Sequence, residues 1–324
     1  MARRVVVTGA AGFIGMHAVQ EFIDSGYEVT CIDNLKPAYG GDLAAMRSEN
    51  LRANYSTEVV NLDLAEEKNL HELANIFHGA HAVIHLAAWP GVRQSQQIPH
   101  AYARANLSAF TYVLEAVRLA RPSLFMFASS SSIYGDLGDH GPVKEHDANG
   151  VGLRSFYAAT KWANEILAKN HSSITGIPTM ALRFFTVYGE FGRPDMAYWT
   201  FLEKMLKGEK LSLYGDTGGK RNFTYVKDAS RILLKLTEQS FSGYQPINIA
   251  LDEPVTTYEF LTRISESAGV EPLVEIVPRP TVDVASTWAD QTSLISLIGK
   301  LTPTPIEFGV ARFVDWYKRE VHKN

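Results

Sequence analysis

The sequence has only one cysteine, Cys31, among its 324 residues. A single thiol cannot form a disulfide bond within the chain, so a disulfide-stabilised secreted domain is excluded and a reducing compartment, the cytoplasm, is expected. No apolar run approaches the roughly 20 residues that a membrane-spanning helix needs. Because a glycine motif begins within ten residues of Met1, we also expect no secretory signal peptide.

The sequence also lacks a large excess of charge of either sign. It has 31 Lys and Arg against 35 Asp and Glu, a formal net charge of −4 at pH 7. This balance gives no electrostatic reason to expect nucleic acid or an anionic membrane as a partner. We see no internal repeat and no low-complexity segment, and we predict no metal site. A hydrophobic content of 46% is that of an ordinary globular protein of one or two domains.

What the sequence does have, at its start, is an apolar run broken by three glycines. Residues 4–8 read as a strand, and Gly9, Gly12 and Gly15 follow in a tight turn into a helix. Gly9 can adopt a positive φ in the turn, Gly12 lets the backbone approach a pyrophosphate, and Gly15 lets the helix pack close to the strand. The start of the helix then offers free N–H groups to the anion.

A second apolar run, residues 27–32, ends in Asp33, eighteen residues beyond Gly15. An acidic side chain at this strand end can accept hydrogen bonds from both hydroxyls of the adenosine ribose, which favours NAD over NADP. The competing interpretation of the glycines is a plain loop. The strand before them, the helix after them and the acid at the next strand end together favour dinucleotide binding.

Apolar runs and helical patterns alternate through the first part of the chain. We predict strands at residues 4–8, 27–32, 56–61, 82–88, 124–128 and 179–183, and helices at residues 42–53, 66–78, 99–120 and 153–171. This alternation is typical of an α/β protein with a Rossmann-type, doubly wound parallel sheet. Ligands of such sheets bind at the carboxyl ends of the strands.

Aromatic residues, glycine and proline crowd residues 184–199, where we place the crossing into a smaller C-terminal α/β region. We predict an NAD-binding domain at residues 1–183, to which residues 226–251 return, and a substrate-binding domain at residues 184–324. Later elements are expected at residues 199–207, 226–239, 256–268 and 305–322 (helices) and at residues 211–213 (strand).

Several polar or small residues follow the predicted strands. Asp63 could accept a hydrogen bond from the adenine amino group while Leu64 covers the ring, or Asp63 could be a solvated helix cap. The small residues Ala87 and Ala88 would let the nicotinamide ribose lie against the backbone. We interpret His85 as a hydrogen-bonded core residue, and Asn106 is an isolated polar residue on an otherwise amphipathic helix.

Tyr157 and Lys161 lie four residues apart on a predicted helix, which puts both side chains on one face. A free tyrosine has a pKa of about 10 and is a poor base at neutral pH. We expect the Lys161 ammonium and a positive nicotinamide ring to favour the Tyr157 phenolate, which could take a hydroxyl proton while hydride leaves the same carbon. Ser130, in a run of four serines after a strand, is the best candidate to bind that hydroxyl. The alternative is a chance Tyr–Lys spacing.

With these motifs the chain resembles the extended short-chain dehydrogenase/reductase superfamily, its nucleotide-sugar epimerase branch and, within it, the UDP-glucuronate 4-epimerases. The matching segments span nearly the whole chain: residues 8–15, 85–88, 91–93, 128–135, 157–161, 183–197, 221–228 and 288–290. By this resemblance the substrate is a UDP-sugar, Tyr157 is the base, Lys161 lowers its pKa and binds the nicotinamide ribose, and Ser130 assists at the C4 hydroxyl. NAD would stay tightly bound, take hydride from C4 and return it to the other face.

The same motifs imply two sets of binding residues. The cofactor set is Gly9, Gly12, Phe13, Ile14, Gly15, Asp33, Asn34, Asp63, Leu64, Leu86, Ala87, Ala88, Asn106, Tyr157, Lys161 and Phe184. The substrate set is Arg93, Ser130, Ser131, Ser132, Thr186, Met196, Arg193, Arg221 and Arg279. Its four arginines are candidate cations for the diphosphate, because a guanidinium binds phosphate oxygens bidentately. Arg279 departs from the usual spacing relative to Trp288.

A substrate with a carboxylate at C5 would pass through a β-keto acid, which loses carbon dioxide unless the carboxylate is held out of alignment. Ser131, Ser132 and Thr186 could hold it, and the resemblance suggests the same positions. Related dehydratases and decarboxylases carry acidic residues after the position of Ser130, where this chain has serines. Without a carboxylate base beside C5, the sequence favours epimerisation.

We therefore predict an NAD-dependent isomerase that interconverts UDP-glucuronate and UDP-galacturonate without decarboxylation. The alternatives are a UDP-glucose/UDP-galactose 4-epimerase, a UDP-glucuronate decarboxylase and a non-enzymatic NAD-binding regulator. The helices at residues 99–120 and 153–171 could pair with their copies in a four-helix bundle, as in related dimers, so we expect a homodimer.

Overall fold

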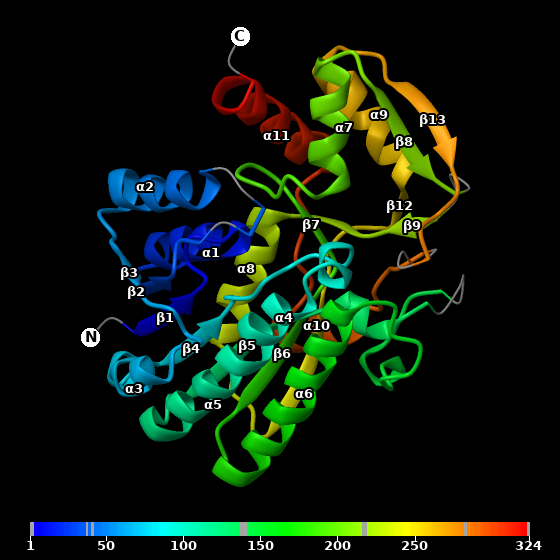
Figure 1. Ribbon diagram of the computed structural model, residues 1–324. Helices are drawn as coiled ribbons and strands as arrows, with labels where there is room; N and C mark the ends of the chain where they lie inside the picture. The colour runs from blue at the N-terminus through cyan, green and yellow to red at the C-terminus, as the bar shows by residue number, and fades with distance from the viewer. Residues whose placement is uncertain are drawn as a thin grey trace.

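The computed structural model describes residues 3–36, 38–39, 42–136, 141–215, 219–281, 284 and 286–322. Its centre is a seven-stranded sheet in the order β11-β6-β5-β4-β1-β2-β3, with every neighbouring pair parallel (Figure 1). The strands are β1 (Arg4–Thr8), β2 (Glu28–Asp33), β3 (Val59–Asn61), β4 (Ala82–His85), β5 (Leu124–Ser130), β6 (Thr179–Phe184) and β11 (Tyr244–Ile249). The order reverses between β1 and β4, as in a doubly wound sheet, so the predicted fold class is confirmed.

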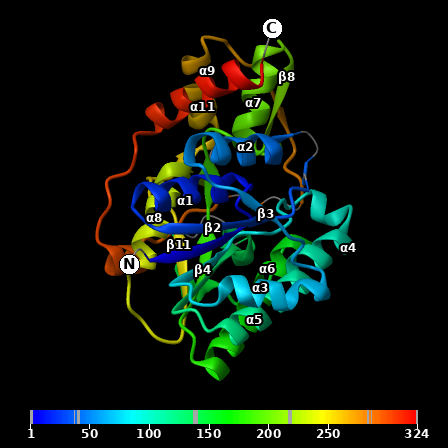
Figure 2. The same cartoon turned by 90° about the vertical axis from the view of Figure 1, so that its left-hand side faces the viewer.

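Helices cover both faces of this sheet (Figure 2). One face carries α1 (Phe13–Asp24), α2 (Leu43–Tyr55) and α8 (Val226–Thr237), and the other carries α3 (Leu70–Phe77), α4 (Pro99–Tyr102), α5 (Ala109–Ala120) and α6 (Phe156–Thr175). The alternation along β1 shows why two layers form. Val5 and Val7 pack with Phe22 of α1, whereas Val6 packs with Phe110 of α5, because successive side chains of a strand point to opposite faces.

The remaining elements form a second, smaller group, at the top of Figure 1. They are β7 (Thr186–Tyr188), α7 (Ala197–Leu206), β8 (Lys210–Tyr214), β9 (Lys220–Arg221), β10 (Phe223–Tyr225), β12 (Val255–Thr256), α9 (Thr257–Ala268), β13 (Leu273–Val277) and α11 (Ile306–Glu320). The helix α10 (Thr292–Ile298) instead packs on β11 and α8 beside the central sheet. Aromatic rings join several of them: Tyr198 of α7 meets Phe313 of α11 edge-on with 4.9 Å between ring centroids, and Phe223 of β10 stacks on Phe260 of α9 at 3.9 Å.

Residues 226–251 lie against the central sheet: α8 packs on α1, and β11 pairs with β6. The division into two domains, with its boundary at residue 183 and the return of residues 226–251, stays a prediction. Strand β11 itself was not predicted, nor were the short strands β7, β9, β10 and β12, the strand β13 or the helix α10. Two-residue and three-residue strands carry too few side chains to show a period.

Most predicted elements differ from the structure by a few residues at their ends, and the strand expected at residues 82–88 already ends at His85. Three further differences have a clear local cause. The strand expected at residues 56–61 begins only at Val59, because α2 continues to Tyr55 and Ser56 ends it in a left-handed conformation, φ 50°. The helix expected at residues 153–171 is α6, which Ser155 caps by accepting from the Ala158 N–H and which Gly176 ends. The helix expected at residues 99–120 contains a π-helical turn, η3 (Ala103–Ser108), between α4 and α5.

Within the residues that the structure describes, we find no helix with the length and apolar character needed to cross a bilayer.

Candidate active site

A cavity of about 850 Å³ lies between the carboxyl ends of the sheet strands and the second group of elements. Eighteen of the predicted site residues line it: Gly12, Phe13, Ile14, Gly15, Leu86, Ala88, Arg93, Ser130, Ser131, Ser132, Tyr157, Lys161, Phe184, Thr186, Arg193, Met196, Arg221 and Arg279. The others, Gly9, Asp33, Asn34, Asp63, Leu64, Ala87 and Asn106, are not among its lining residues. Parts of the chain that are far apart in sequence thus meet at one place.

The three glycines of the first turn are required by close packing. Gly9 has a φ of +72°, and a Cβ added there would lie 2.5 Å from the backbone nitrogen of Ala87. Cβ atoms on Gly12 and Gly15 would lie 2.8 Å and 1.9 Å from the Gly9 carbonyl oxygen. The turn of Gly9 and the close approach of Gly15 are therefore as predicted, while the approach of a pyrophosphate to Gly12 stays a prediction.

Asp33 and Asp63 lie at the ends of neighbouring strands with different surroundings. The Asp33 carboxylate accepts hydrogen bonds from the N–H groups of Ala11 (3.0 Å) and Leu35 (2.8 Å), and burial raises its pKa. Asp63 accepts from Lys36 (2.9 Å) and Arg104 (3.1 Å). Burial alone would raise the pKa of Asp63, but these hydrogen bonds and one from Ala65 lower it to about 2.

The solvated helix cap considered for Asp63 is therefore not what the structure contains, because the side chain is ion-paired. Its predicted hydrogen bond to adenine stays a prediction, as does the cover of the ring by the buried Leu64. Sequence reasoning missed Lys36 and Arg104, which lie 27 and 41 residues from Asp63 along the chain.

His85 and Asn106 are both buried and hydrogen-bonded. Nδ1 of His85 lies 2.7 Å from the Thr8 hydroxyl, and burial lowers the histidine pKa to about 3, so it is the core residue expected. Asn106 lies in the π-helical turn η3, accepts from the Trp89 N–H (2.7 Å), and donates to the Trp89 carbonyl (3.0 Å) and to Thr160 (3.2 Å). Asn106 thus fixes the segment after β4 that carries Ala87 and Ala88.

Tyr157 and Lys161 project from α6 into the cavity. The Lys161 ammonium donates to the Ala128 carbonyl (2.8 Å) and lies 5.9 Å from the centroid of the Tyr157 ring. Burial lowers the pKa of Lys161 to about 7 and raises the pKa of Tyr157, against the opposing effects of Arg193 and a hydrogen bond with Ser130. We expected Lys161 to lower the pKa of Tyr157. In the protein alone, desolvation of the phenolate outweighs the positive charge of Arg193, and the effect of Lys161 together with bound NAD stays a prediction.

The four serines at residues 129–132 have different surroundings. Ser130 accepts hydrogen bonds from the Ser132 N–H (3.2 Å) and the Ser132 hydroxyl (2.9 Å), so its own hydroxyl hydrogen can donate toward Tyr157 at the cavity wall. Ser131 lines the same wall. Ser129 instead is buried and donates to Glu165 of α6 (2.5 Å).

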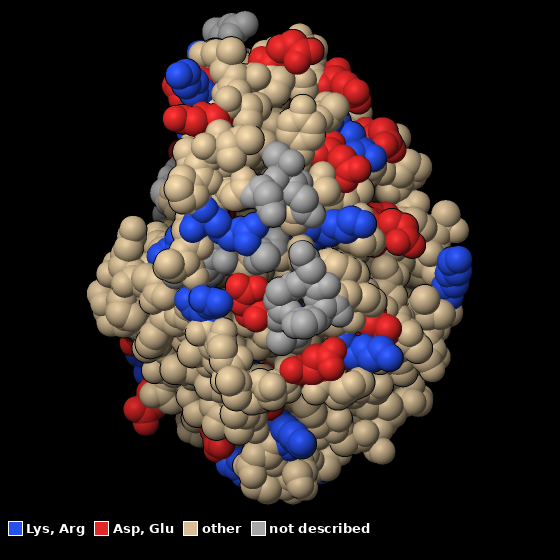
Figure 3. All heavy atoms as spheres, turned by 90° about the vertical axis from the view of Figure 1, so that its right-hand side faces the viewer, with Lys and Arg blue, Asp and Glu red and all other residues tan. Residues whose placement is uncertain are grey.

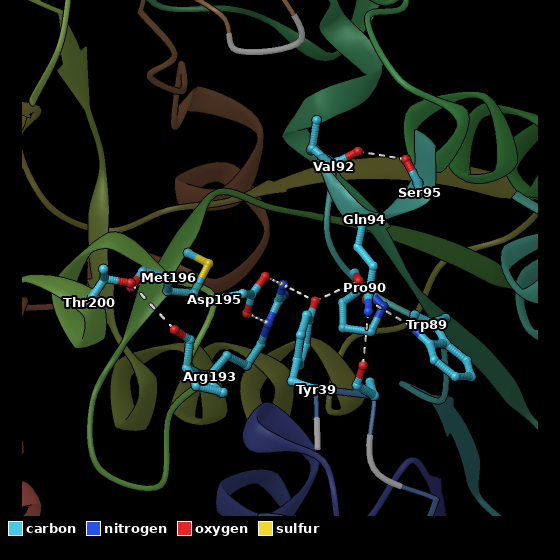
Figure 4. Close-up of polar contacts among 12 residues, drawn as sticks. Tyr39, Trp89, Pro90, Val92, Gln94, Ser95, Arg193, Asp195, Met196 and Thr200 are labelled. Carbon is cyan, nitrogen blue, oxygen red and sulfur yellow. Dashed lines mark hydrogen bonds and ion pairs between the residues drawn. The ribbon is translucent and has the colours of Figure 1, made fainter. Parts of the chain in front are cut away.

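The candidate arginines are divided between two places. Arg193 pairs with Asp195 and contacts Tyr39 (Figure 4). Arg93 instead lies over the ring of Tyr214, 4.6 Å from its centroid. Arg279 lies near the same place, because a Cβ on Gly215, the residue after Tyr214, would be 2.9 Å from Nη2 of Arg279.

Arg221 donates to the Thr287 hydroxyl (3.0 Å) and the Val284 carbonyl (2.9 Å). Lys and Arg side chains gather in a band across the middle of the face shown in Figure 3. Binding of a diphosphate by any of the four arginines stays a prediction.

Asp195 is the one carboxylate among the described residues that line the cavity. Sequence reasoning missed it, since the argument against a carboxylate base covered only the residues after Ser130. Asp195 is engaged by both Nε and Nη2 of Arg193 (3.0 and 2.6 Å).

A buried arginine, Arg47 of α2, holds two segments of the site together. It donates to the carbonyls of Phe191 (2.7 and 2.9 Å) and Gly192 (2.8 Å), just before Arg193, and to the carbonyl of Ala11 in the glycine turn (3.4 Å). Burial lowers the pKa of its guanidinium to about 10, and the carbonyl acceptors keep it in place.

Comparison with known proteins agrees with this geometry. The model of the NAD dependent epimerase/dehydratase family matches residues 5–250, a range that includes the glycine turn, the serine run, Tyr157 and Lys161. The chain belongs to this family.

Individual members of the NAD dependent epimerase/dehydratase family match over almost the full length. A probable UDP-glucuronate 4-epimerase of Rhizobium meliloti is 32% identical over 338 residues, covering 99% of this chain and 98% of the relative. The structure of the UDP-glucuronic acid 4-epimerase of Bacillus cereus, in complex with UDP-glucuronic acid and NAD, superposes with a TM-score of 0.89 at 29% identity, covering 98% and 99% of the two chains. The UDP-glucose 4-epimerase of Thermus thermophilus, in complex with NAD, gives 0.85 at 28% identity, covering 98% and 100%.

In this member of the family a buried ion pair supports the serine wall. Glu165 of α6 accepts from Nε and Nη2 of Arg183 (3.0 and 2.7 Å), from Ser129 and from Tyr244 (3.0 Å). Both charged side chains are about 97% buried. The pair ties α6 to the ends of β5 and β6, so it sets the positions of Ser130 and Tyr157.

Proposed function

We propose that this protein is an NAD-dependent 4-epimerase that interconverts UDP-glucuronate and UDP-galacturonate through a 4-keto intermediate. The observation that carries the proposal is the meeting of Tyr157, Lys161, Ser130 and Thr186 in the wall of the cavity that the glycine turn opens into. The similarity to UDP-glucuronate 4-epimerases over nearly the whole chain supports the same substrate.

The described residues fit NAD. The glycine turn lies at the start of α1, where unpaired N–H groups can bind a pyrophosphate, and Asp33 is the last residue of β2, where a carboxylate can accept from ribose hydroxyls. Lys161, on α6, would bind the nicotinamide ribose. When bound, NAD supplies a reversible acceptor of hydride for C4 of the sugar.

The protein's own part of the reaction is the movement and placement of protons. Tyr157 would take the proton of the C4 hydroxyl and later return it to the C4 oxygen, once the sugar has turned its opposite face to the cofactor. Ser130 would turn its hydroxyl hydrogen from Tyr157 to the C4 oxygen of the bound sugar, because Ser132 already fills its acceptor positions. The Lys161 ammonium would stabilise the phenolate that forms on Tyr157.

Retention of the carboxylate is the step that separates an epimerase from a decarboxylase. Ser131, Ser132 and Thr186, the first residue of β7, all line the cavity. Hydroxyl donors from these two segments can hold a carboxylate out of the perpendicular alignment that favours loss of carbon dioxide. Because Asp195 is bound to Arg193, it is poorly available as a base at C5.

The direct test is to incubate the purified protein with UDP-glucuronate and with UDP-glucose separately and to read the products by NMR. We expect UDP-galacturonate from the first incubation and little turnover of the second. Formation of UDP-galactose alone would support the UDP-glucose 4-epimerase alternative. Release of carbon dioxide with a UDP-pentose would support the decarboxylase, and no turnover of either sugar would support a binding protein.

Substitution of Thr186 tests how the carboxylate is held. Thr186→Ala should raise the decarboxylated fraction of the product about tenfold, since a lost hydrogen bond to a charged group is worth about 1.5 kcal/mol. The fraction is measured by NMR after complete conversion. Thr186→Ser keeps the hydroxyl and should leave the fraction near that of the unaltered protein; equal leakage from both variants would contradict the role of this hydroxyl.

We also propose a homodimer formed through α5 and α6. These helices expose apolar side chains in a way unusual for a monomer surface: Leu119 (44%), Ile166 (54%), Leu167 (40%) and Ile174 (74%). Light scattering should give twice the mass of one chain, and Ile166→Asp combined with Ile174→Asp should shift the mass toward one chain. A monomer mass for the unaltered protein would reject the dimer.

A cytoplasmic location is our proposal as well, on the evidence of the single cysteine. Cys31 is buried in β2, and burial raises the pKa of its thiol to about 12. A thiol of this kind is inert to oxidation and metal binding, which fits a structural residue rather than a redox centre.

A further inference from the structure

We propose that Tyr39 and Asp195 are positioning residues that hold the guanidinium of Arg193 at one fixed place in the cavity wall, beside Tyr157. The inference rests on the proposed function, in which the sugar reacts next to Tyr157. It assigns a purpose to two residues outside the predicted site, one from the segment after β2 and one from the segment after β7.

The contacts use three of the five N–H groups of Arg193. Its Nε and Nη2 donate to the two oxygens of Asp195 (3.0 and 2.6 Å), and the second hydrogen of Nη2 goes to the Tyr39 hydroxyl (2.7 Å). A guanidinium has five N–H groups, so the two on Nη1 remain. Among the described residues none accepts from Nη1, and Arg193 lines the cavity. Asp195 and Tyr39 therefore leave one edge of the guanidinium, the edge with Nη1, to contact a bound molecule.

The place that receives Tyr39 is built for it. Its hydroxyl donates to the Pro90 carbonyl (2.6 Å), which also accepts from Tyr102 (2.6 Å). Gly91 has a φ of +106°, and a Cβ there would lie 2.6 Å from the Tyr39 hydroxyl. Figure 4 shows Tyr39 pointing between Pro90 and the Arg193–Asp195 pair, so three segments of the chain converge on one hydroxyl.

The charge of the Arg193 guanidinium affects the ionisation of Tyr157. The Tyr102 ring that shares Pro90 with Tyr39 meets the Tyr157 ring edge-on, with 6.3 Å between centroids. The charge of Arg193 favours the Tyr157 phenolate and the charge of Asp195 opposes it, while Lys161 approaches from within α6. A displaced Arg193 would change both the groups that face the sugar and the field at the base.

A double-mutant cycle tests the proposal. Tyr39→Phe removes only the hydroxyl, and we expect it to lower kcat/KM for UDP-glucuronate about tenfold, mainly through kcat. In an Arg193→Met background the same change should have no further effect, within about twofold. Asp195→Asn should behave in the same way. It should lower kcat/KM when Arg193 is present and should cause no further loss in the Arg193→Met background, where the Asp195 carboxylate has no guanidinium to hold. The affinity for NAD, measured by titration, should be the same in all variants.

Two results would overturn the inference. One is an equal loss from Tyr39→Phe in both backgrounds, which would mean that Tyr39 acts elsewhere, and the other is no loss in the presence of Arg193. Tyr55→Phe, a tyrosine on α2 outside the cavity, is the matched control and should change neither background. If the protein epimerises UDP-glucose and not UDP-glucuronate, the proposed substrate is wrong, but the cycle run with UDP-glucose still decides the role of Tyr39.

Discussion

Tyr157→Phe should lower kcat by roughly 10³-fold, in the range by which a general base accelerates a reaction, while leaving NAD binding unchanged. Phenylalanine keeps the ring that packs edge-on against Tyr102 and the wall of the cavity. It loses the hydroxyl that we propose as the base for the C4 proton. Turnover is followed by NMR of the UDP-sugar pool, and NAD binding by titration of the same preparation.

The burial of Tyr157 makes this prediction stronger. Since desolvation raises the pKa of Tyr157 in the protein alone, the active phenolate must draw its stabilisation from charges assembled around it. Lys161 is held by the Ala128 carbonyl and has a different geometry. Turnover within tenfold of the unaltered protein would show that another group is the base.

Glu165→Gln should lower the free energy of unfolding by about 3 kcal/mol, as expected when a buried charge loses its partner. Glutamine has nearly the shape of glutamate, but it leaves the Arg183 guanidinium buried without its counter-charge, and its amide group faces the donors of Arg183. The change is measured by denaturant unfolding at a fixed NAD concentration, because a bound ligand adds to apparent stability.

An exposed pair provides the control for Glu165. Glu49 and Arg52 lie one helical turn apart on α2, and each side chain is 59% exposed. Glu49→Gln should therefore leave the unfolding midpoint unchanged within error, because water screens such a pair. Equal effects from the two substitutions would show that the Glu165–Arg183 pair contributes no more than a surface contact.

Much of the fold could be predicted because its determinants are local in sequence. The strand of residues 4–8, the three glycines and Asp33 lie within 30 residues, and each needs only a short backbone pattern to be recognised. The Tyr157–Lys161 pair is equally local, since the helix period alone puts both side chains on one face. The cavity wall at residues 130–132 followed from its position after a buried strand.

The rest of the site depends on contacts between distant residues. Glu165 has the spacing of an ordinary helix residue and nothing near it in sequence marks it as buried; only the fold brings Arg183, Ser129 and Tyr244 around it. Tyr39 and Arg193 are separated by 154 residues. The raised pKa of Tyr157 was missed for a related reason, since a single neighbouring charge can be predicted from spacing whereas the depth of burial cannot.

Arg47 limits how this protein can change over evolutionary time. One guanidinium spans the carbonyl of Ala11 and those of Phe191 and Gly192, so the dinucleotide turn and the segment that leads to Arg193 share a single tie. An insertion or a transplanted loop in one segment moves the carbonyls of that segment away from the Arg47 guanidinium, because the carbonyls of the other segment still hold the guanidinium in place. The two segments are therefore expected to be inherited together, and a chimaera that exchanges only one of them should fold less well than a chimaera that exchanges both.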